Sequence, residues 1–336
     1  MFATLLASAL LAFIGQAPAE TGSRDVTFEN RAPSSEPTEL VRRFAWPGQW
    51  RTQQQYELAN ERFHLRVPDT REPNGEPFGL LVWISPTPDG RVPPNYEAAL
   101  DKHRLIWVSA HNTGNDRNLM QRLGLALDAA YNVPFQYDID PERVYVAGLS
   151  GGGRCASHLG VNYSDIFRGA LPIIGCNFYR EVEPPSRPGK LWRAFHAPTP
   201  GMKKLAAMQP LVIVTGSGDG NREQCHTYAQ AYEADGFTAV TYIEVQGMGH
   251  TYPPAETFDK ALGHLDERDG PDEATLKRHD LADRRLDDAL ADLEDKPLVG
   301  KRKLRGLARS MPDTPAGRRA RFIADRLDVG LPIEQD

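Results

Sequence analysis

Short apolar runs alternate with amphipathic stretches between about Tyr56 and Gly263. The runs are apolar on both faces, which is typical of buried strands, and the stretches between them repeat apolar residues at helical spacing. The pattern predicts strands at 80–84, 105–108, 143–147, 171–174, 211–214 and 238–245, and helices at 96–103, 116–130, 151–160, 222–234 and 255–265. We therefore expect an α/β fold with a mostly parallel, doubly wound sheet. Ligands of such sheets bind beyond the carboxyl ends of the strands, so the residues after each strand are the candidates for chemistry.

The N-terminal part of the chain lacks this alternation. Residues 2–14 are an apolar run that is too short to span a bilayer, and the small residues Ala17 and Ala19 follow it. This pattern predicts a secretory signal peptide over residues 1–19, hence export to the periplasm or beyond. The alternatives are an uncleaved anchor or an ordinary helix. Residues 20–55 are polar and contain several prolines, which predicts a linker or surface strap.

The C-terminal 72 residues, 265–336, form a third region, in which 32 residues are charged. Apolar residues recur there at helical spacing, for example Leu286, Leu290 and Leu293, so we expect a charged tail of amphipathic helices. The tail either packs on the domain or on itself, or it offers a surface to a partner protein. Its first half is acidic and its second half basic, so the two halves can neutralise each other.

Composition narrows the classes of function. The chain has 336 residues and a formal net charge of −6, which gives it no electrostatic footprint for nucleic acid. After loss of the signal peptide no long apolar run remains, so we expect no membrane association. The glycine-rich segment 148–153 lacks the spacing of phosphate-binding and dinucleotide-binding loops, and no histidine, cysteine or acidic cluster has metal-ligand spacing. We therefore expect no cofactor and no metal, with residues 56–264 as the catalytic domain.

The sharpest motif is Gly148-Leu149-Ser150-Gly151-Gly152, which lies between a predicted strand and a predicted helix. A glycine two residues before and after Ser150 permits a tight turn that exposes the hydroxyl, and the N–H of Gly151 then faces an incoming carbonyl oxygen. This context predicts a nucleophilic serine at the carboxyl edge of the sheet.

A serine hydroxyl needs a base, and the base needs a group that orients it. Asp219 follows the strand at 211–214, and His250 lies in a glycine-rich loop after the last strand. Both positions are at the carboxyl edge, where they can converge on Ser150. The nearby acids Glu223 and Asp235 fall on a predicted helix and are interpreted as solvated charges.

Other residues at the same edge are candidates for the substrate pocket. Ser85 and His111 each follow a predicted buried strand, and Trp192 lies in a long connection, residues 176–209, that is suited to a cap over the site. The other histidines, His111 included, can equally be surface or supporting residues.

The three motifs around Ser150, Asp219 and His250 resemble those of the α/β-hydrolase superfamily. The pattern is most similar to secreted esterases of the polyhydroxyalkanoate depolymerase and feruloyl esterase kind, and to peptidases of the prolyl oligopeptidase type. The resemblance covers about residues 56–263 and implies a carboxylic-ester hydrolase that works through an acyl-enzyme, acting on a small or polymeric ester. A serine peptidase and a non-catalytic hydrolase-fold binding protein are the alternatives.

The chain departs from these families in one respect. They often have the dipeptide His-Gly after the strand that here ends at Ile84, and that dipeptide supplies the second hydrogen-bond donor to the oxyanion. Here the sequence is Ser85-Pro86-Thr87-Pro88, and proline has no N–H. The Thr87 N–H is the expected substitute beside that of Gly151, with the N–H or hydroxyl of Ser85 as the alternative.

The chain has three cysteines, which cannot all pair within one monomer. Cys176 ends a predicted strand and Cys225 follows the Asp219 loop, so these two are predicted to form a disulfide. Cys155 lies on the helix after Ser150 and is expected to be a buried thiol.

Overall fold

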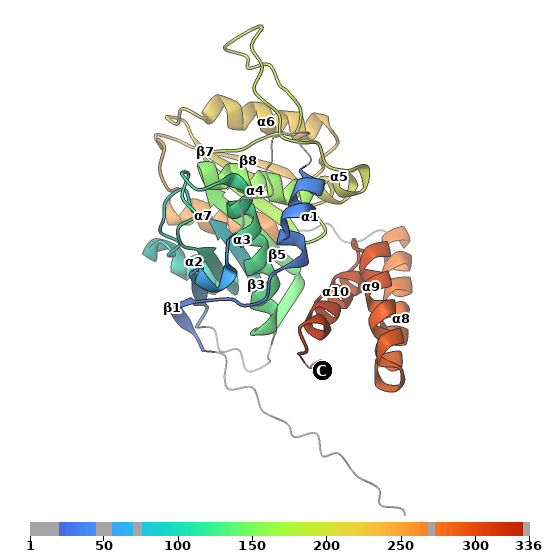
Figure 1. The fold of residues 1–336 in the computed structure, drawn as a ribbon. Coiled ribbons are helices and arrows are strands. Elements are labelled where there is room, and N and C mark those ends of the chain that lie inside the picture. The colour runs from blue at the N-terminus through green and yellow to red at the C-terminus, as the bar shows by residue number, and fades with distance from the viewer. Residues whose placement is uncertain (1–19, 45–55, 70–75, 268–272, 332–336) are drawn as a thin grey trace, which may run out of the picture.

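The computed structural model describes residues 20–44, 56–69, 76–267 and 273–331; the expected signal peptide, residues 1–19, lies outside them. An eight-stranded sheet with the order β1-β2-β4-β3-β5-β6-β7-β8 forms the centre of the molecule (Figure 1). Parallel pairing joins β4, β3, β5, β6, β7 and β8, while β1 and β2 add antiparallel pairing at one edge. This confirms the predicted α/β class. The strands are β1 (Gly22–Val26), β2 (Phe63–Val67), β3 (Phe78–Ile84), β4 (Leu105–Ala110), β5 (Ile139–Leu149), β6 (Gly169–Ile173), β7 (Leu211–Gly216) and β8 (Val240–Val245).

Ten α-helices accompany the sheet in the described part of the chain. They are α1 (Pro37–Arg43), α2 (Glu97–Lys102), α3 (Leu119–Asn132), α4 (Gly151–Asn162), α5 (Pro200–Ala207), α6 (Arg222–Ala234), α7 (Ala255–Asp266), α8 (Glu273–Asp295), α9 (Pro297–Ser310) and α10 (Pro315–Asp328). Among the described helices, none is both long enough and apolar enough to cross a bilayer.

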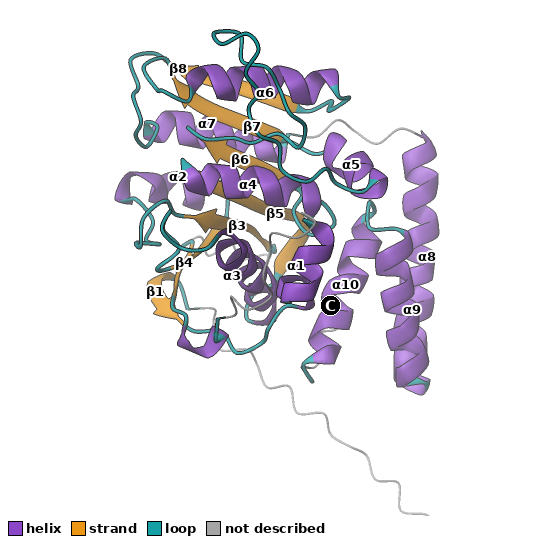
Figure 2. Cartoon of the chain, turned by 45° about the horizontal axis from the view of Figure 1, so that its top comes forward, coloured by secondary structure: helices purple, strands orange, loops and turns teal. Residues whose placement is uncertain are grey.

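The two faces of the sheet bury two separate apolar cores. In β3, Leu80 and Val82 belong to a core that also contains side chains of α3, α4 and α6, whereas Leu81 and Trp83 belong to a core with side chains of α2 and α7. Figure 2 shows these two groups of helices on the two faces of the sheet. Successive side chains of a strand alternate between faces, so a strand buried on both sides must be apolar throughout. This is why the central strands are continuous apolar runs in the sequence.

The predicted polar strap is wrong for residues 20–44, which belong to the domain. β1 pairs with β2 along its whole length, α1 follows, and Phe28 and Leu40 are almost fully buried. The sequence Gly-Ser-Arg-Asp-Val of β1 has little apolar character because it forms the edge of the sheet, where much of it faces water. Periodicity in hydrophobic residues therefore could not identify it.

The charged tail is a bundle of three helices, α8, α9 and α10, packed around Leu286, Leu304 and Ile323, as the spacing of its apolar residues predicts. In Figure 2, α10 lies between the other two tail helices and the body of the domain. Arg318 of α10 forms an ion pair with Glu142 at 2.8 Å, and Arg326 donates to the carbonyl oxygen of Pro134 at 3.1 Å. The tail is thus docked on the domain through basic residues of α10.

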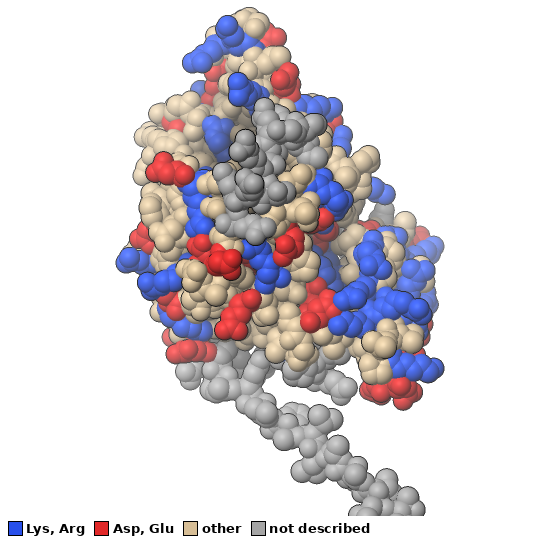
Figure 3. Space-filling model, viewed as in Figure 1, with Lys and Arg blue, Asp and Glu red and all other residues tan. Residues whose placement is uncertain are grey.

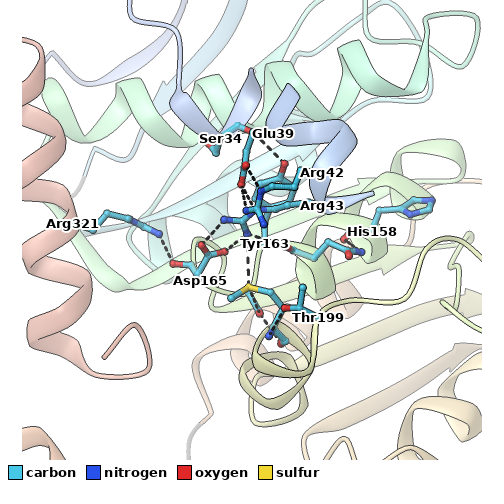
Figure 4. Close-up of polar contacts among 12 residues, drawn as sticks. Ser34, Glu39, Arg42, Arg43, His158, Tyr163, Asp165, Thr199 and Arg321 are labelled. Atoms are coloured by element: carbon cyan, nitrogen blue, oxygen red, sulfur yellow. Dashed lines mark hydrogen bonds and ion pairs between the residues drawn. The ribbon is translucent and has the colours of Figure 1, made fainter. Parts of the chain in front are cut away.

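A polar joint connects α1, the segment after α4 and the tail (Figure 4). Arg43 donates to both carboxylate oxygens of Asp165, at 2.7 and 2.9 Å, and also to Glu39 at 2.8 Å. Arg321 of α10 donates to the backbone oxygen of Asp165. A cavity of about 350 Å³ lies beside this joint, between α1, α3 and α10. Burial raises the pKa of Asp325, which lines the cavity, to about 6.

Charges gather on the surface of the tail, where Figure 3 shows Lys and Arg side chains over the helices. Ion pairs connect its acidic and basic halves: Lys303 contacts Asp292 at 2.6 Å, and Arg278 contacts Asp313 at 2.6 Å. Exposed pairs of this kind contribute little stability individually. They do show that the two halves neutralise part of each other's charge within the bundle.

Candidate active site

Ser150 lies in a sharp turn between β5 and α4. Its φ of 54° and ψ of −115° are in a region that non-glycine residues rarely adopt, and its N–H donates to the Ile173 carbonyl oxygen at 2.8 Å. The strand before the turn and the helix after it hold this conformation. The first turn of α4 also directs free backbone N–H groups and the positive end of the helix dipole toward the same place.

The glycines around Ser150 are required by close packing of the backbone. A Cβ on Gly148 would lie 2.4 Å from the carbonyl carbon of Gly152, and a Cβ on Gly152 would lie 1.8 Å from the carbonyl oxygen of Ile84. Both distances are far below van der Waals contact. The turn from β5 into α4 can therefore lie this close to β3 only if neither residue has a side chain.

The structure brings Ser150, Asp219 and His250 together at the carboxyl edge of the sheet, although 31 and 100 residues of sequence separate the pairs. Nε2 of His250 lies 2.8 Å from Ser150 Oγ, and its Nδ1 lies 2.8 Å from Asp219 Oδ1. The side chain of Asp219 is completely buried, whereas that of His250 is half exposed. An aspartate that accepts from Nδ1–H leaves Nε2 unprotonated and able to accept a proton from the serine.

A second set of residues holds Asp219 in place. The Asn221 N–H donates to Asp219 Oδ1 at 3.1 Å, and the Thr215 hydroxyl lies 3.4 Å from Oδ2. Arg154 of α4 in turn donates to Asn221 Oδ1 at 3.3 Å and to Gln224 Oε1 at 2.6 Å. Sequence reasoning missed Asn221 and Arg154, and only the position of Asn221 in the same loop as Asp219 could have indicated it.

The structure argues against Thr87 as the second oxyanion donor. Its N–H donates to Ser85 Oγ at 3.2 Å, and the Ser85 hydroxyl also contacts the Thr87 hydroxyl at 3.1 Å. Ser85 is completely buried, and its carbonyl oxygen accepts from Arg122. Both residues are therefore engaged in a compact local turn, which Pro86 and Pro88 make rigid. The sequence could not show this bond, because it depends on the rotamer of Ser85.

His111 belongs to a different cluster, at the antiparallel edge of the sheet. Its Nε2 lies 3.0 Å from Asp25 Oδ1, which is also 3.2 Å from Nδ1 of His64. The three side chains are close enough to share a metal ion. However, the Gly90 N–H donates to His111 Nδ1, so the neutral ring carries its proton on Nε2 and donates it to Asp25. A protonated nitrogen cannot ligate a metal, and a ligating histidine normally donates through its other nitrogen. We therefore interpret the cluster as a hydrogen-bonded clasp that holds β1 on the sheet.

Trp192 is half-buried in the long connection, against α6. Its ring packs against Tyr228 of α6, 5.5 Å between centroids, and its backbone pairs with Val182. The long connection is anchored by aromatic residues at its base, including Phe178 and Phe195, which are buried in the main core. Its aromatic content therefore reflects packing of the connection itself.

The predicted disulfide is not formed in the structure. Cys155, Cys176 and Cys225 are all buried free thiols, and the Cys176 thiol contacts the Asn177 carbonyl oxygen at 3.6 Å. Burial raises the pKa of Cys155 to about 11 and that of Cys225 to about 12. Thiols that stay protonated at neutral pH are weak nucleophiles, so these side chains act as small apolar residues of the core.

Comparison with curated proteins finds two polyester-degrading enzymes. The chain is 29% identical to a polyhydroxybutyrate depolymerase of Talaromyces funiculosus over 147 residues, which is 39% of this chain and 43% of that protein. It is 46% identical to poly(3-hydroxyalkanoate) depolymerase C of Paucimonas lemoignei over 44 residues, 13% of this chain and 11% of that protein. The chain thus spans less than half the length of the curated relatives it matches. No family model matches the chain.

Solved structures with similar coordinates include hydrolases. An S-formylglutathione hydrolase from Staphylococcus aureus is 12% identical, with 73% of this chain and 99% of that chain covered and a TM-score of 0.49. Est1E from Butyrivibrio proteoclasticus is 16% identical, with 60% and 91% covered and a TM-score of 0.42.

The fold carries the three converging residues in a definite order along the chain. A strained serine turn leads from a central parallel strand into a helix, and an acid and a histidine follow in the order that the resemblance implies. The relatives found by sequence are named as depolymerases of ester polymers. The chain thus has an α/β fold in which a serine, an acid and a histidine meet at the carboxyl edge of the sheet, and part of its sequence is similar to these depolymerases.

Proposed function

We propose that the protein hydrolyses carboxylic esters through an acyl-enzyme, with Ser150 as nucleophile, His250 as general base and Asp219 as the residue that orients His250. The observation that carries the proposal is the unbroken chain of two 2.8 Å contacts from Asp219 through His250 to the hydroxyl of Ser150. Such a chain activates a hydroxyl that is otherwise a weak nucleophile.

The geometry supports the following steps. As Ser150 Oγ bonds to the ester carbonyl carbon, its proton moves to His250 Nε2 and the π electron pair moves onto the carbonyl oxygen. The N–H of Gly151, at the start of α4, stabilises that oxyanion. The intermediate collapses with loss of the alcohol, which takes the proton from Nε2. Water then attacks the acyl-enzyme by the same steps and releases the acid.

The substrate we propose is a hydroxyalkanoate ester, either an oligomer or a polymer. The support is the sequence similarity to proteins named as polyhydroxybutyrate and poly(3-hydroxyalkanoate) depolymerases. We also propose that residues 1–19 direct export, because an insoluble polymer outside the cell can be reached only by an exported enzyme. N-terminal sequencing of the mature protein should begin near Glu20; an intact Met1 would contradict export.

Ser150→Ala tests the reaction. We expect it to abolish hydrolysis of p-nitrophenyl butyrate and labelling by a fluorophosphonate, because the attacking oxygen is gone. Ser23→Ala, on the exposed part of β1, is the matched control and should retain both activities. Persistence of hydrolysis in Ser150→Ala would overturn the proposal.

A substrate screen tests the ester class. Suspended poly(3-hydroxybutyrate), soluble 3-hydroxybutyrate oligomers, feruloyl esters and peptide anilides are compared with the same enzyme preparation. Hydrolysis of hydroxyalkanoate esters at the highest kcat/KM supports the proposed substrate. A preference for feruloyl esters or peptides would leave the serine mechanism in place and refute the substrate class.

A further inference from the structure

In the proposed oxyanion site, the Ser150 turn supplies one hydrogen-bond donor, the Gly151 N–H. A second donor has still to be identified. A single donor is unusual, since sites of this kind use two or more preorganised hydrogen bonds. The expected second donor, the Thr87 N–H, is given to Ser85 Oγ. A second donor can therefore come from another segment that reaches the Ser150 turn.

Asn115 lies on that segment, the loop between β4 and α3. An ideal Cβ on Gly151 would lie 2.0 Å from Asn115 Oδ1, 2.8 Å from its Cγ and 3.2 Å from its Nδ2. The carboxamide of Asn115 thus fills the space that a side chain at position 151 would occupy, directly beside the residue that follows Ser150. A side chain at position 151 would therefore collide with Asn115, whereas side chains at positions 148 and 152 would collide with the backbone.

The loop is held at this place by its own bonds. The Asn115 N–H donates to the Pro86 carbonyl oxygen at 2.9 Å. A Cβ on Gly114 would lie 3.0 Å from the carbonyl carbon of Thr87, so the two loops are in direct contact. The backbone of Asn115 is therefore fixed against the rigid Pro86 turn, while its side chain is exposed at the carboxyl edge of the sheet.

We propose that Asn115 is a catalytic residue whose side-chain N–H₂ gives the oxyanion its second hydrogen bond. This inference rests on the proposed function. A carboxamide has a donor corner and an acceptor corner, and a rotation about its Cβ–Cγ bond exchanges them, so the group beside Gly151 can direct its N–H₂ to the oxygen that the Gly151 N–H also faces. Negative charge develops on that oxygen only during the reaction. The hydrogen bond therefore strengthens in the transition state and should act on kcat more than on KM.

The test compares Asn115→Asp and Asn115→Ala with the wild-type full chain. Asn115→Asp keeps the shape but replaces the donor with a negative charge. We expect kcat for p-nitrophenyl butyrate to fall by about 10²-fold or more in both variants, with KM changed by less than about threefold. Asp116→Ala, an exposed neighbour in the same loop, is the matched control and should keep the wild-type kcat.

A second readout separates a donor role from a structural one. A trifluoromethyl ketone adds to Ser150 and places a negative oxygen in the oxyanion site, so its affinity should fall in parallel with kcat in Asn115→Asp. The melting temperature should remain that of the wild type. Wild-type kcat or wild-type inhibitor affinity in Asn115→Asp would overturn the proposal for Asn115, provided that Ser150→Ala is inactive. Hydrolysis that survives in Ser150→Ala would overturn the proposed function, and the role of Asn115 with it.

Discussion

The Ser150 site and the tail joint are both chains of polar contacts, but they leave their side chains in different states. At the site, the backbone is strained at Ser150 and the His250 side chain is half exposed. At the joint, Arg43 has three charge-assisted hydrogen bonds to carboxylates, and both it and Asp165 are mostly buried. A group that must exchange a proton has to remain accessible, whereas a group that joins elements is most effective when it is fully paired.

This contrast predicts a division of effects between the two regions. Changes of polar side chains at the Ser150 site should reduce turnover with little effect on stability. Changes at the joint should reduce stability with little effect on turnover. The following predictions test whether effects on turnover and effects on stability separate in this way.

The largest effect is expected for His250→Gln. Loss of the proposed general base should lower kcat by about 10⁴-fold, which corresponds to about 5.5 kcal/mol of transition-state stabilisation. The melting temperature should stay unchanged, because the ring is half exposed. His226→Gln, on the exposed side of α6, serves as the control for histidine loss and should keep full turnover. A kcat within tenfold of the wild type in His250→Gln would remove His250 from the mechanism.

Gly152→Ala should be an exception to this separation, because Gly152 lies at the Ser150 site and its substitution should nevertheless reduce stability. The added Cβ would lie 1.8 Å from the Ile84 carbonyl oxygen, so β3 or the turn must shift. We expect a loss of about 3 kcal/mol in the free energy of unfolding, measured by urea denaturation. In Gly201→Ala the new methyl group meets nothing within 4 Å, and stability should not fall. Equal stability of the two variants would show that the close approach is not rigid.

Asp165→Asn tests the joint. Burial alone would raise the pKa of Asp165, but the hydrogen bonds and charge of Arg43 outweigh it and hold the pKa below its ordinary value. The substitution removes the charge of one of the two carboxylates that pair with Arg43, so the free energy of unfolding should fall by about 2 kcal/mol while kcat stays constant. Arg42→Ala removes an exposed contact to Glu39 and should change stability by less than about 0.5 kcal/mol. A fall in kcat in Asp165→Asn would show that the joint and the site are coupled.

The smallest effect is expected for Asp25→Asn in the clasp of β1, and it should depend on pH. Hydrogen bonding from His111, with a further contribution from His64, lowers the pKa of Asp25 below 3.8 despite its partial burial. A carboxyl with a lowered pKa stabilises the folded state above its unfolded pKa, and this contribution is lost as the pH falls through the folded pKa.

The wild type should therefore have a higher melting temperature than Asp25→Asn at about pH 5. This difference in melting temperature should shrink as the pH is lowered toward about pH 2.5. Asp116→Asn makes the same change of charge at an exposed loop position and should show no such trend. A difference that stays constant over the whole range would mean that the charge of Asp25 does not hold the clasp. Burial lowers the pKa of His64 as well, which adds acid sensitivity below about pH 6.5 in both proteins.

Much of the central fold could be read from the sequence, because strands buried on both faces must be apolar runs and helices must show their own period. The edge of the sheet could not. The five residues of β1 carry only one apolar side chain, and their pairing with β2 is a matter of backbone hydrogen bonds that any sequence can make. The cluster of Asp25, His64 and His111 could not be predicted from the sequence for the same reason, since Asp25 lies in β1.

The sequence by itself determined the class of fold and predicted the turn at Ser150 and the proposed acid and base, Asp219 and His250, because glycine spacing and the order of strands and loops constrain them locally. Tertiary structure alone decided which side chains meet across loops: Asn221 on Asp219, Asn115 beside Gly151, Ser85 on the N–H of Thr87, and Arg321 on Asp165. Loops after different strands converge only once the sheet is formed, and their contacts depend on rotamers and close approaches that leave no period in the sequence.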